Sequence, residues 1–323
     1  MASLPLLEVD GLTTSVGGLK ILDGVSFRIG DGEVVGVVGE SGSGKSMTAL
    51  ATMRLLPTSV GVTSGRILFE GTDLLGLGET AMRRIRGDRI AMIFQEPMSS
   101  LNPVLTIGEQ IVETLAWHRG MDRAQARRRA IELLDLVEIP AAAKRVGDYP
   151  HQLSGGMRQR VMIAIALACE PKLLIADEPT TALDVTVQAQ VLDLLRGLRR
   201  ELAMSVMLIT HDLGVVAEFA DRVVVLYAGR VAETSPVKAL FRRPAHPYTQ
   251  GLLASIPPLD GPLAKPRPIP GSVPALADMP AGCRFHPRCA VATGRCTTTQ
   301  PPFVPQGPGH EAACWHVDTG DTP

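Results

Sequence analysis

The stretch Gly39-Glu40-Ser41-Gly42-Ser43-Gly44-Lys45-Ser46 decides how the chain folds around it. It matches the P-loop pattern G-x-x-x-x-G-K-[ST], in which glycines let backbone N–H groups surround phosphate oxygens at the start of a helix. The nearly continuous apolar run from Glu33 to Val38 precedes it, as expected for a strand buried in a parallel sheet. A helix is expected from Ser46 to about Leu56. A strand, a glycine-rich turn and a helix in this order predict a phosphate-binding site.

A second apolar strand, Leu173 to Ala176, ends in the acidic pair Asp177 and Glu178. Beside a P-loop, an acidic residue at a strand end can hold Mg²⁺, and the next carboxylate can orient and deprotonate an attacking water. Lys45 is expected to reach the β- and γ-phosphates, and the Ser46 hydroxyl to bind Mg²⁺. The sequence therefore predicts an ATP site with catalytic Lys45 and Glu178.

Apolar periodicity places the other elements. Strands or hairpins are expected at 6–12, 20–29, 65–75, 90–94, 205–210 and 222–227. Helices are expected at 107–118, 123–137 and 185–201. Strands that alternate with helices predict an α/β domain with a largely parallel sheet.

Composition limits the classes of partner. The 323 residues are 45% hydrophobic, and 32 basic side chains balance 33 acidic ones for a formal net charge of −1. No global basic footprint exists, so no nucleic-acid partner is expected. No apolar run reaches the roughly 18 to 20 residues of a membrane-spanning helix, and residues 1–5 lack the features of a signal peptide. We expect a cytoplasmic protein that docks onto a membrane protein.

The segment Leu153-Ser154-Gly155-Gly156-Met157-Arg158-Gln159-Arg160 resembles the signature motif of ABC ATPases. In that family the motif contacts the γ-phosphate held by the opposite subunit of a head-to-tail dimer. Gln95 matches the Q-loop glutamine, Ala182-Leu183-Asp184 the D-loop, and His211 the switch histidine. The resemblance thus adds Gln95 and His211 to the catalytic residues.

The resemblance also implies the residues that contact nucleotide and metal. In the same subunit they are Gly39, Glu40, Ser41, Gly42, Ser43, Gly44, Lys45, Ser46, Met47, Gln95 and Asp177. In the opposite subunit they are Ser154, Gly155, Gly156 and Asp184. Mg²⁺ is expected on Ser46, Gln95 and Asp177. The family usually stacks an aromatic residue on adenine, but the matching stretch Thr13-Thr14-Ser15-Val16 has none, and Val16 offers only a weaker apolar contact.

Wider motifs are similar to the D-type ATPase subunit of dipeptide and oligopeptide permeases. They are the segments 155–164, 178–190 and Gln95-Glu96-Pro97-Met98-Ser99-Ser100-Leu101-Asn102-Pro103. This resemblance implies an importer ATPase on the cytoplasmic face of the membrane, driving uptake of peptides or of another solute such as nickel or glutathione. Its partners would be a second, usually non-identical ATPase, two transmembrane permeases and an extracytoplasmic binding protein. A soluble non-transport ABC ATPase is the alternative, although such proteins carry two fused cassettes or long coiled coils.

The resemblance implies three structural parts. The first is a P-loop (RecA-like) ABC ATPase core with an antiparallel β subdomain, at 1–95 and 171–243. The second is a helical subdomain at 96–170, whose residues 96–120 would receive the permeases. The third is a small cysteine-containing C-terminal extension at 244–323, with a proline-rich linker over 257–280.

Four of the five cysteines lie in that extension: Cys283, Cys289, Cys296 and Cys314. In a reducing cytosol this clustering favours a metal site over disulfides. The short gaps do not fit the C-x₂₋₄-C pairs of structural zinc sites. Some similar permease ATPases carry a four-iron cluster in this extension, so a [4Fe–4S] cluster is expected. Zinc and free thiols remain the alternatives.

Overall fold

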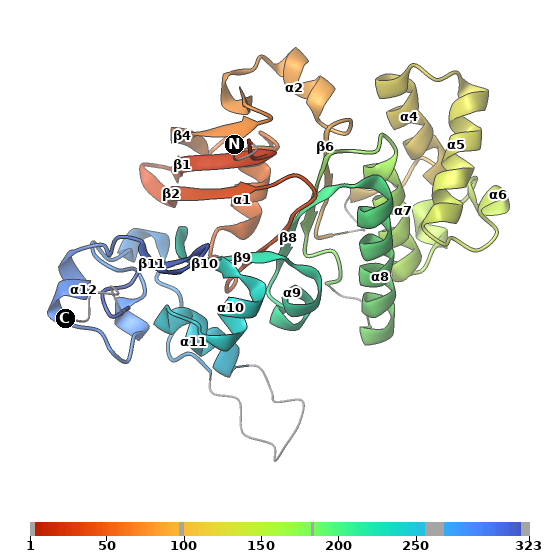
Figure 1. The fold of residues 1–323 in the computed structure, drawn as a ribbon. Helices are drawn as coiled ribbons and strands as arrows, with labels where there is room; N and C mark the ends of the chain where they lie inside the picture. The colour runs from red at the N-terminus through yellow and green to blue at the C-terminus, as the bar shows by residue number, and fades with distance from the viewer. Residues whose placement is uncertain (1–3, 97–99, 182–183, 256–267, 318–323) are drawn as a thin grey trace. The chain divides into compact units, whose positions relative to one another are not determined.

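The computed structural model, drawn as a ribbon in Figure 1, describes residues 4–96, 100–181, 184–255 and 268–317. The chain divides into two units. The first unit comprises Met1–Gly30, Val34–Leu75 and Leu208–Pro323, and the second comprises Asp31–Glu33 and Gly76–Met207. Strand β8 (Ser205–Thr210), buried along its whole length, carries the chain from the second unit back into the first. The division into three parts expected from the sequence stays a prediction.

An antiparallel sheet opens the first unit. It holds β1 (Leu7–Val16), β2 (Leu19–Ile29), β4 (Gly61–Phe69) and β5 (Thr72–Asp73) in the order β2-β1-β4-β5. Leu7 pairs with Ile29 on one side and with Phe69 on the other, and all three side chains are buried. These apolar cross-strand neighbours hold the sheet together. The strands and hairpin predicted from the sequence are confirmed.

The P-loop lies on a second sheet of the same unit. Its strands are β3 (Val34–Val38), β9 (Arg222–Tyr227), β10 (Arg230–Pro236), β11 (Val304–Gly307) and β12 (His310–Ala312). Their order is β11-β12-β10-β9-β3, and β3 runs parallel to β9. Helices α1 (Lys45–Thr52), α9 (Leu213–Phe219), α10 (Val237–Arg242) and α11 (Pro247–Ala254) belong to this unit. Helix α9 packs so closely that a Cβ at Gly36 would lie 3.1 Å from a Val216 methyl group.

The second unit pairs a short parallel sheet with helices. Strand β6 (Ile90–Ile93) runs parallel to β7 (Leu173–Asp177). Its described helices are α2 (Glu79–Ile85), α4 (Ile107–Arg119), α5 (Arg123–Leu136), α6 (Ala142–Arg145), α7 (Gly155–Leu167) and α8 (Val185–Leu202).

Capping boxes start α4 at Thr106 and α5 at Asp122, because each side chain accepts a backbone N–H that the helix leaves unpaired. The two helices predicted from periodicity near residues 107 and 123 are confirmed.

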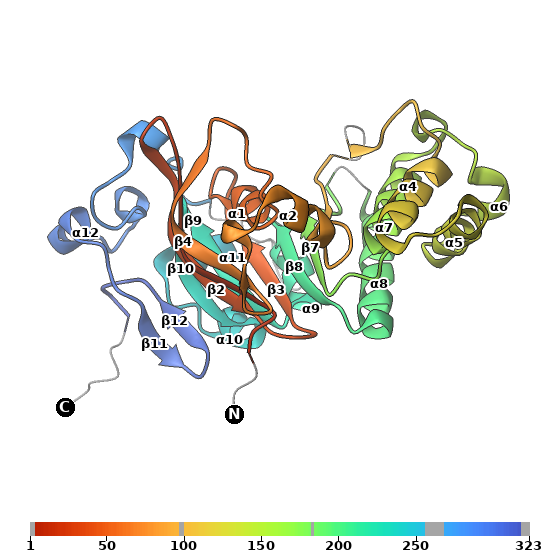
Figure 2. The same ribbon diagram turned by 90° about the horizontal axis from the view of Figure 1, so that it is seen from above.

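The C-terminal extension adds strands that the sequence analysis did not predict. The β11–β12 hairpin pairs with β10 through Glu233 and Thr234 (Figure 2). The proline-rich segment predicted at 257–280 falls partly outside the described residues, and its described part contains a single 3₁₀ turn, Leu276–Asp278. Further turns follow at His286–Arg288 and in α12 (Gly294–Thr298). The extension therefore continues the sheet that carries the P-loop.

Buried groups from β9 and β10 complete the core of the extension, to which its own helix α11 contributes Tyr248. Phe285 packs against the rings of Tyr227 and Tyr248 at centroid distances of 5.2 and 5.4 Å. The carboxylate of Glu233, fully buried on β10, accepts hydrogen bonds from the backbone of His246 at 2.8 Å and contacts His310 Nε2 at 2.7 Å. A buried carboxylate is tolerated only with such partners.

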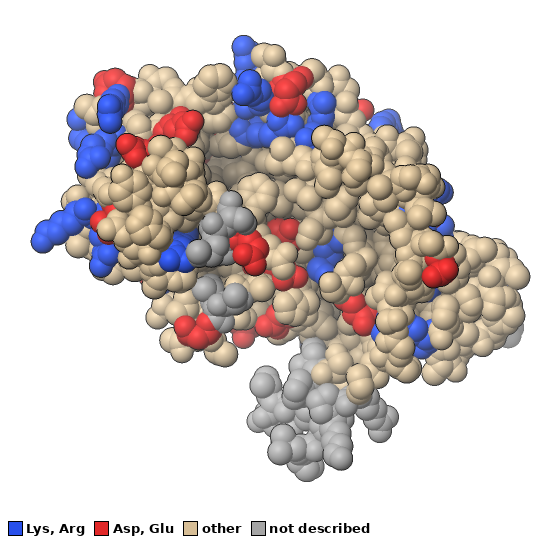
Figure 3. All heavy atoms as spheres, turned by 180° about the vertical axis from the view of Figure 1, so that it is seen from behind, with Lys and Arg blue, Asp and Glu red and all other residues tan. Residues whose placement is uncertain are grey.

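Charged side chains of both signs occur on the face shown in Figure 3, as the nearly balanced composition requires. Within the described ranges, no helix combines the length and the apolar character needed to cross a membrane.

Because His246 is buried in this packing, the stability of the fold depends on pH. Burial lowers the pKa of His246 to about 4, although a hydrogen bond to the Ala313 backbone opposes the shift. Its Nδ1 accepts the Tyr248 backbone N–H at 3.0 Å and so caps α11. The buried ring is therefore neutral near pH 7, whereas in the unfolded chain the same group titrates near an ordinary pKa of about 6.5.

The unfolded chain binds more protons than the folded chain between these two pKa values, so stability falls as the pH decreases from about 6.5 to about 4. Lowering the pH from 7 to 5 should therefore reduce the free energy of unfolding by about 2 kcal/mol through this histidine alone. His246→Asn keeps an acceptor for the Tyr248 N–H and removes the titration. Urea denaturation at both pH values should show a smaller loss in the variant; equal losses would contradict the assignment, because Glu233 and His310 are present in both proteins.

Candidate nucleotide-binding and catalytic site

The P-loop between β3 and α1 has a backbone that only glycine accommodates at three positions. The φ angles of Gly39, Gly42 and Gly44 are 154°, 77° and 102°. A Cβ on Gly39 would lie 2.2 Å from the Leu226 carbonyl oxygen, and one on Gly44 would lie 2.6 Å from Leu22 Cδ2. Gly39 and Gly44 are therefore required by sterics as well as by backbone conformation, and Gly42 by backbone conformation.

Two polar side chains of the loop point to a phosphate ligand. Lys45 is 6% exposed, and its Nζ donates to the carbonyl oxygens of Gly39 and Glu40 at 2.7 and 3.0 Å. Ser43 Oγ is buried and has no hydrogen-bond partner among the described residues. A lysine curled over the loop and a buried hydroxyl without a partner fit a loop that takes up phosphate oxygens. Ser46 and Met47 follow, half-buried, in the first turn of α1.

In the second unit, the parallel register of β6 and β7 brings Gln95 next to Glu178. Ile93 pairs with Ala176, so Gln95 and Glu178, each two positions further along the chain, lie side by side. Gln95 Nε2 donates to Glu178 Oε2 at 2.9 Å, and Thr181 Oγ1 donates to the same oxygen at 2.8 Å. Glu178 has a left-handed φ of 48°, which is uncommon for a residue with a side chain and often marks functional positions. Asp177, at the end of β7, is buried.

The signature residues begin helix α7 of the same unit. Ser154 is its N-cap and accepts the Met157 N–H at 3.4 Å. Ser154 and Gly155 are exposed, and a Cβ on Gly156 would lie 2.8 Å from a Val187 methyl group. The start of α7 thus presents backbone N–H groups at an exposed helix end, where anions bind readily.

Two other predicted site residues, Asp184 and His211, lie at the start of a helix and at the end of a strand. Asp184 is exposed and caps α8 by accepting the Val187 N–H at 2.9 Å, whereas its D-loop neighbours Ala182 and Leu183 lie outside the described residues. His211 is exposed directly after β8, in the first unit. Asp212, the next residue, caps α9 with bonds from the backbone of Gly214 and Val215 and so ends the strand at the histidine.

The stretch expected to contact adenine is the end of β1. Thr13 and Thr14 are buried, and the Thr14 hydroxyl accepts the Leu22 N–H at 3.3 Å. These side chains therefore stabilise the sheet. Val16 is half-buried at the last position of the strand.

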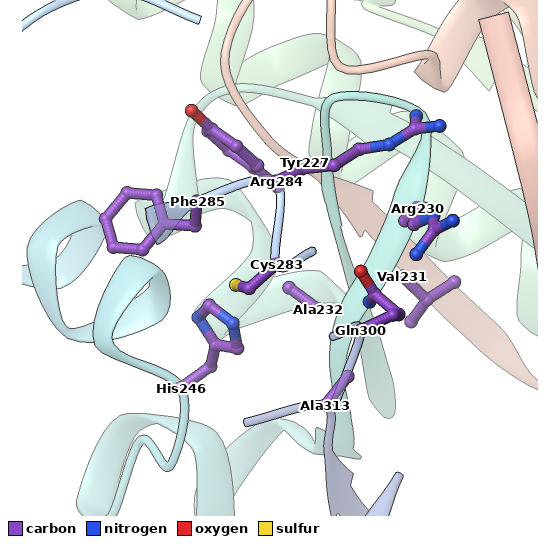
Figure 4. Close-up of a pocket in the computed structure, with 10 residues that line it drawn as sticks. All are labelled: Tyr227, Arg230, Val231, Ala232, His246, Cys283, Arg284, Phe285, Gln300 and Ala313. Atoms are coloured by element: carbon purple, nitrogen blue, oxygen red, sulfur yellow. The ribbon is translucent and has the colours of Figure 1, made fainter. Parts of the chain in front are cut away.

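The four cysteines of the extension line one small cavity, together with His286 and His316. Burial raises the pKa of the thiols of Cys283, Cys289 and Cys314. Cys296 Sγ lies 3.8 Å from His316 Nε2. Figure 4 shows an adjoining pocket in which Cys283 lies with His246 and Phe285. Within the described ranges, no three His, Cys, Asp or Glu side chains are arranged to hold a metal ion.

Sequence reasoning missed two residues that contact the P-loop. Tyr248 Oη accepts the Glu40 N–H at 2.8 Å, and Arg288 binds the Glu40 carboxylate with two nitrogens at 2.6 and 3.0 Å. Neither residue belongs to a phosphate-binding motif, so no local signal identifies them.

Known proteins are similar to this chain over most of its length. Residues 22–181 match the family described as ABC transporter, and residues 232–296 match the oligopeptide/dipeptide transporter C-terminal region. The oligopeptide transport ATP-binding protein AppD of Bacillus subtilis is 54% identical over 315 residues, which are 96% of each chain.

Solved structures agree. A dimeric ATP-binding cassette, MJ0796, in a post-hydrolysis state bound to ADP and Pi, has a TM-score of 0.64 at 32% identity and covers 72% of this chain and 98% of that one. The protein cbiO1 from Clostridium perfringens, part of an ABC transporter complex, has the same TM-score at 28% identity and covers 75% of this chain and 92% of that one. By its motifs, its fold and these relatives, the chain belongs to the ATP-binding proteins of ABC transporters, with the C-terminal region of the oligopeptide/dipeptide type.

Proposed function

We propose that the chain binds MgATP at its P-loop and hydrolyses it. The observation that carries this proposal is the geometry of the P-loop. Its turn requires glycine at Gly39 and Gly44. The Lys45 side chain folds back onto the loop, and the buried Ser43 hydroxyl has no hydrogen-bond partner among the described residues. Lys45 would contact the β- and γ-phosphates. Ser46, Gln95 and Asp177 supply the oxygen ligands that Mg²⁺ prefers. Bound Mg²⁺ would neutralise charge on the phosphates.

Glu178 is the general base in this proposal. Gln95 and Thr181 both donate to its Oε2, which fixes the orientation of the carboxylate. It would accept a proton from the water that attacks the γ-phosphorus, while His211 contacts the γ-phosphate. A base held by two donors needs little reorganisation during the reaction.

A second copy or a homologue completes the site. The exposed start of α7 at Ser154, Gly155 and Gly156 would contact the γ-phosphate bound to the opposite subunit, and Asp184 would cross the same interface. The similar cassette MJ0796 is dimeric in its ADP- and Pi-bound structure, which supports assembly of this chain as a dimer.

The transport role is import of di- or oligopeptides, as the name of the Bacillus relative and the C-terminal family indicate. Nickel or glutathione is the alternative cargo, and a soluble non-transport ATPase the weaker alternative. The partners would be two permeases, a second ATPase and an extracytoplasmic binding protein, with this chain peripheral on the cytoplasmic face. Val104 and Trp117 are 75% and 66% exposed within the segment 96–120, which suits it to receive apolar permease helices.

The cysteine cavity is proposed to hold a [4Fe–4S] cluster. A single zinc ion needs its sulfur ligands to converge at about 2.3 Å from one centre. Within the described ranges no three His, Cys, Asp or Glu side chains are arranged to hold a metal ion, so the proposal rests on the lining of the cavity alone. In a four-iron cluster each thiolate binds a different iron, and four cysteines line this one cavity. Such a cluster would cross-link an extension that has little core of its own.

Glu178→Gln should reduce ATP turnover of the assembled transporter by at least about 100-fold, because a carboxamide cannot accept the proton. Its amide oxygen still accepts from Gln95 and Thr181, so the loop and ATP affinity should persist. ATPase assays and binding of a fluorescent ATP analogue measure the two quantities. Glu132→Gln, a surface carboxylate of the same unit, is the control. Turnover near the wild-type rate would exclude Glu178 as the base.

Affinity purification of the tagged full-length chain from detergent-solubilised native membranes tests the transport role. Mass spectrometry should identify two permeases and a second ATPase, and a peptide-type binding protein would support peptide cargo. Recovery from the soluble fraction alone, or together with ribosomal proteins, would contradict the importer.

Anaerobic purification tests the cysteine site. The wild-type protein should be brown and contain about four iron atoms per chain. Cys314→Ser should lose the colour and the iron, whereas Cys169→Ser, a buried cysteine of the second unit, should keep both. Zinc without iron would favour the zinc alternative, and neither metal would leave free thiols.

A further inference from the structure

The C-terminal extension contacts the P-loop through an ion pair. Arg288, at the end of the turn His286–Arg288, places Nη1 2.6 Å from Glu40 Oε2 and Nη2 3.0 Å from Oε1. Such a two-point fork between guanidinium and carboxylate is directional as well as attractive. Glu40 is the second residue of the P-loop, so a side chain from the far end of the chain binds the phosphate-binding loop.

Arg288 is itself fixed by its surroundings. Its side chain is 4% exposed, its Nε donates to the Pro270 carbonyl at 2.9 Å, and its guanidinium lies 5.8 Å from the centre of the Tyr227 ring. The Glu40 side chain is 31% exposed. Arg288 is therefore fixed by its own surroundings, and it holds the Glu40 carboxylate in turn.

Tyr248 holds the backbone of the same residue. Its hydroxyl accepts the Glu40 N–H at 2.8 Å, and its fully buried ring packs edge-on against Tyr227 at 4.6 Å. The backbone N–H and the carboxylate of Glu40 are thus bound by residues of the extension. The adjacent Glu40 carbonyl accepts from Lys45 Nζ at 3.0 Å, so the same residue also orients the phosphate-binding lysine.

The charge of Glu40 explains why this matters for ATP. A carboxylate in the P-loop lies beside the site proposed for a triphosphate, and like charges at close range repel. Arg288 neutralises that carboxylate through its two-point contact. An unneutralised Glu40 would weaken ATP binding in the ground state and in the transition state alike, which changes KM more than kcat.

We propose that Arg288 is a positioning residue for the nucleotide site, which neutralises Glu40 and, with Tyr248, fixes the start of the P-loop, so that the C-terminal extension sets the affinity for ATP. This inference rests on the proposed role of the P-loop in binding MgATP. It gives the extension a role in the ATPase reaction that is separate from any metal bound at its cysteines.

The test is steady-state ATPase kinetics of the assembled transporter with Arg288→Met in the full chain. KM for ATP should rise by about tenfold with kcat within about twofold of wild type. Arg288→Lys should restore part of the affinity, because it returns the charge without the two-point geometry. In the double variant Glu40→Gln/Arg288→Met, KM should return close to the wild-type value, since no carboxylate remains to be neutralised.

Arg295→Met is the matched control. Arg295 also precedes a cysteine of the cavity, but its guanidinium stacks on the Trp315 ring at 3.4 Å instead of binding the P-loop. Its KM should be unchanged, and melting curves should show that all variants are folded. An unchanged KM in Arg288→Met, or a double variant as impaired as Arg288→Met alone, would overturn the inference. Failure of the wild-type complex to bind or hydrolyse ATP would instead refute the proposed function.

Discussion

The tightly packed P-loop between β3 and α1 is the constraint on which the rest of the structure depends. Gly39 lies against the Leu226 carbonyl on β9, and Gly44 lies against Leu22 on β2. The Ser43 carbonyl accepts the Gly229 N–H at 2.8 Å from the turn between β9 and β10. Both sheets of the first unit therefore meet at the P-loop. A loop held in this way presents its N–H groups in a fixed geometry, as preorganised anion binding requires.

The C-terminal extension depends on the same sheet. It has few apolar side chains, so its Tyr248 and Phe285 pack on Tyr227 of β9. The buried Glu233 fixes the start of α11 and the β11–β12 hairpin with hydrogen bonds. Because its core is shared with β9 and β10, the extension is part of the ATPase fold.

Much of this architecture could be predicted from local patterns. The buried strands at Val34–Val38 and Leu173–Asp177 and the helix starts near residues 107, 123 and 185 follow from apolar periodicity and capping residues. Helix α1 ends at Thr52, earlier than predicted, because Arg54 adopts a left-handed φ of 51° that periodicity does not reveal. Strands β10 to β12 were missed because short strands with proline and glycine carry little alternation, and their pairing partners lie far away in the chain.

The sequence by itself determined the nature and order of the chemical groups: the P-loop, Gln95, the signature, the acidic pair and His211. These depend on residue type and on spacing over a few positions, which are local properties of a chain. Only the tertiary structure decided that Gln95 donates to Glu178 and that Arg288 binds Glu40, a residue 248 positions away. Such contacts arise from strand register and from the packing of the extension on β9 and β10, and no pattern along the chain encodes the direction in which a distant side chain points.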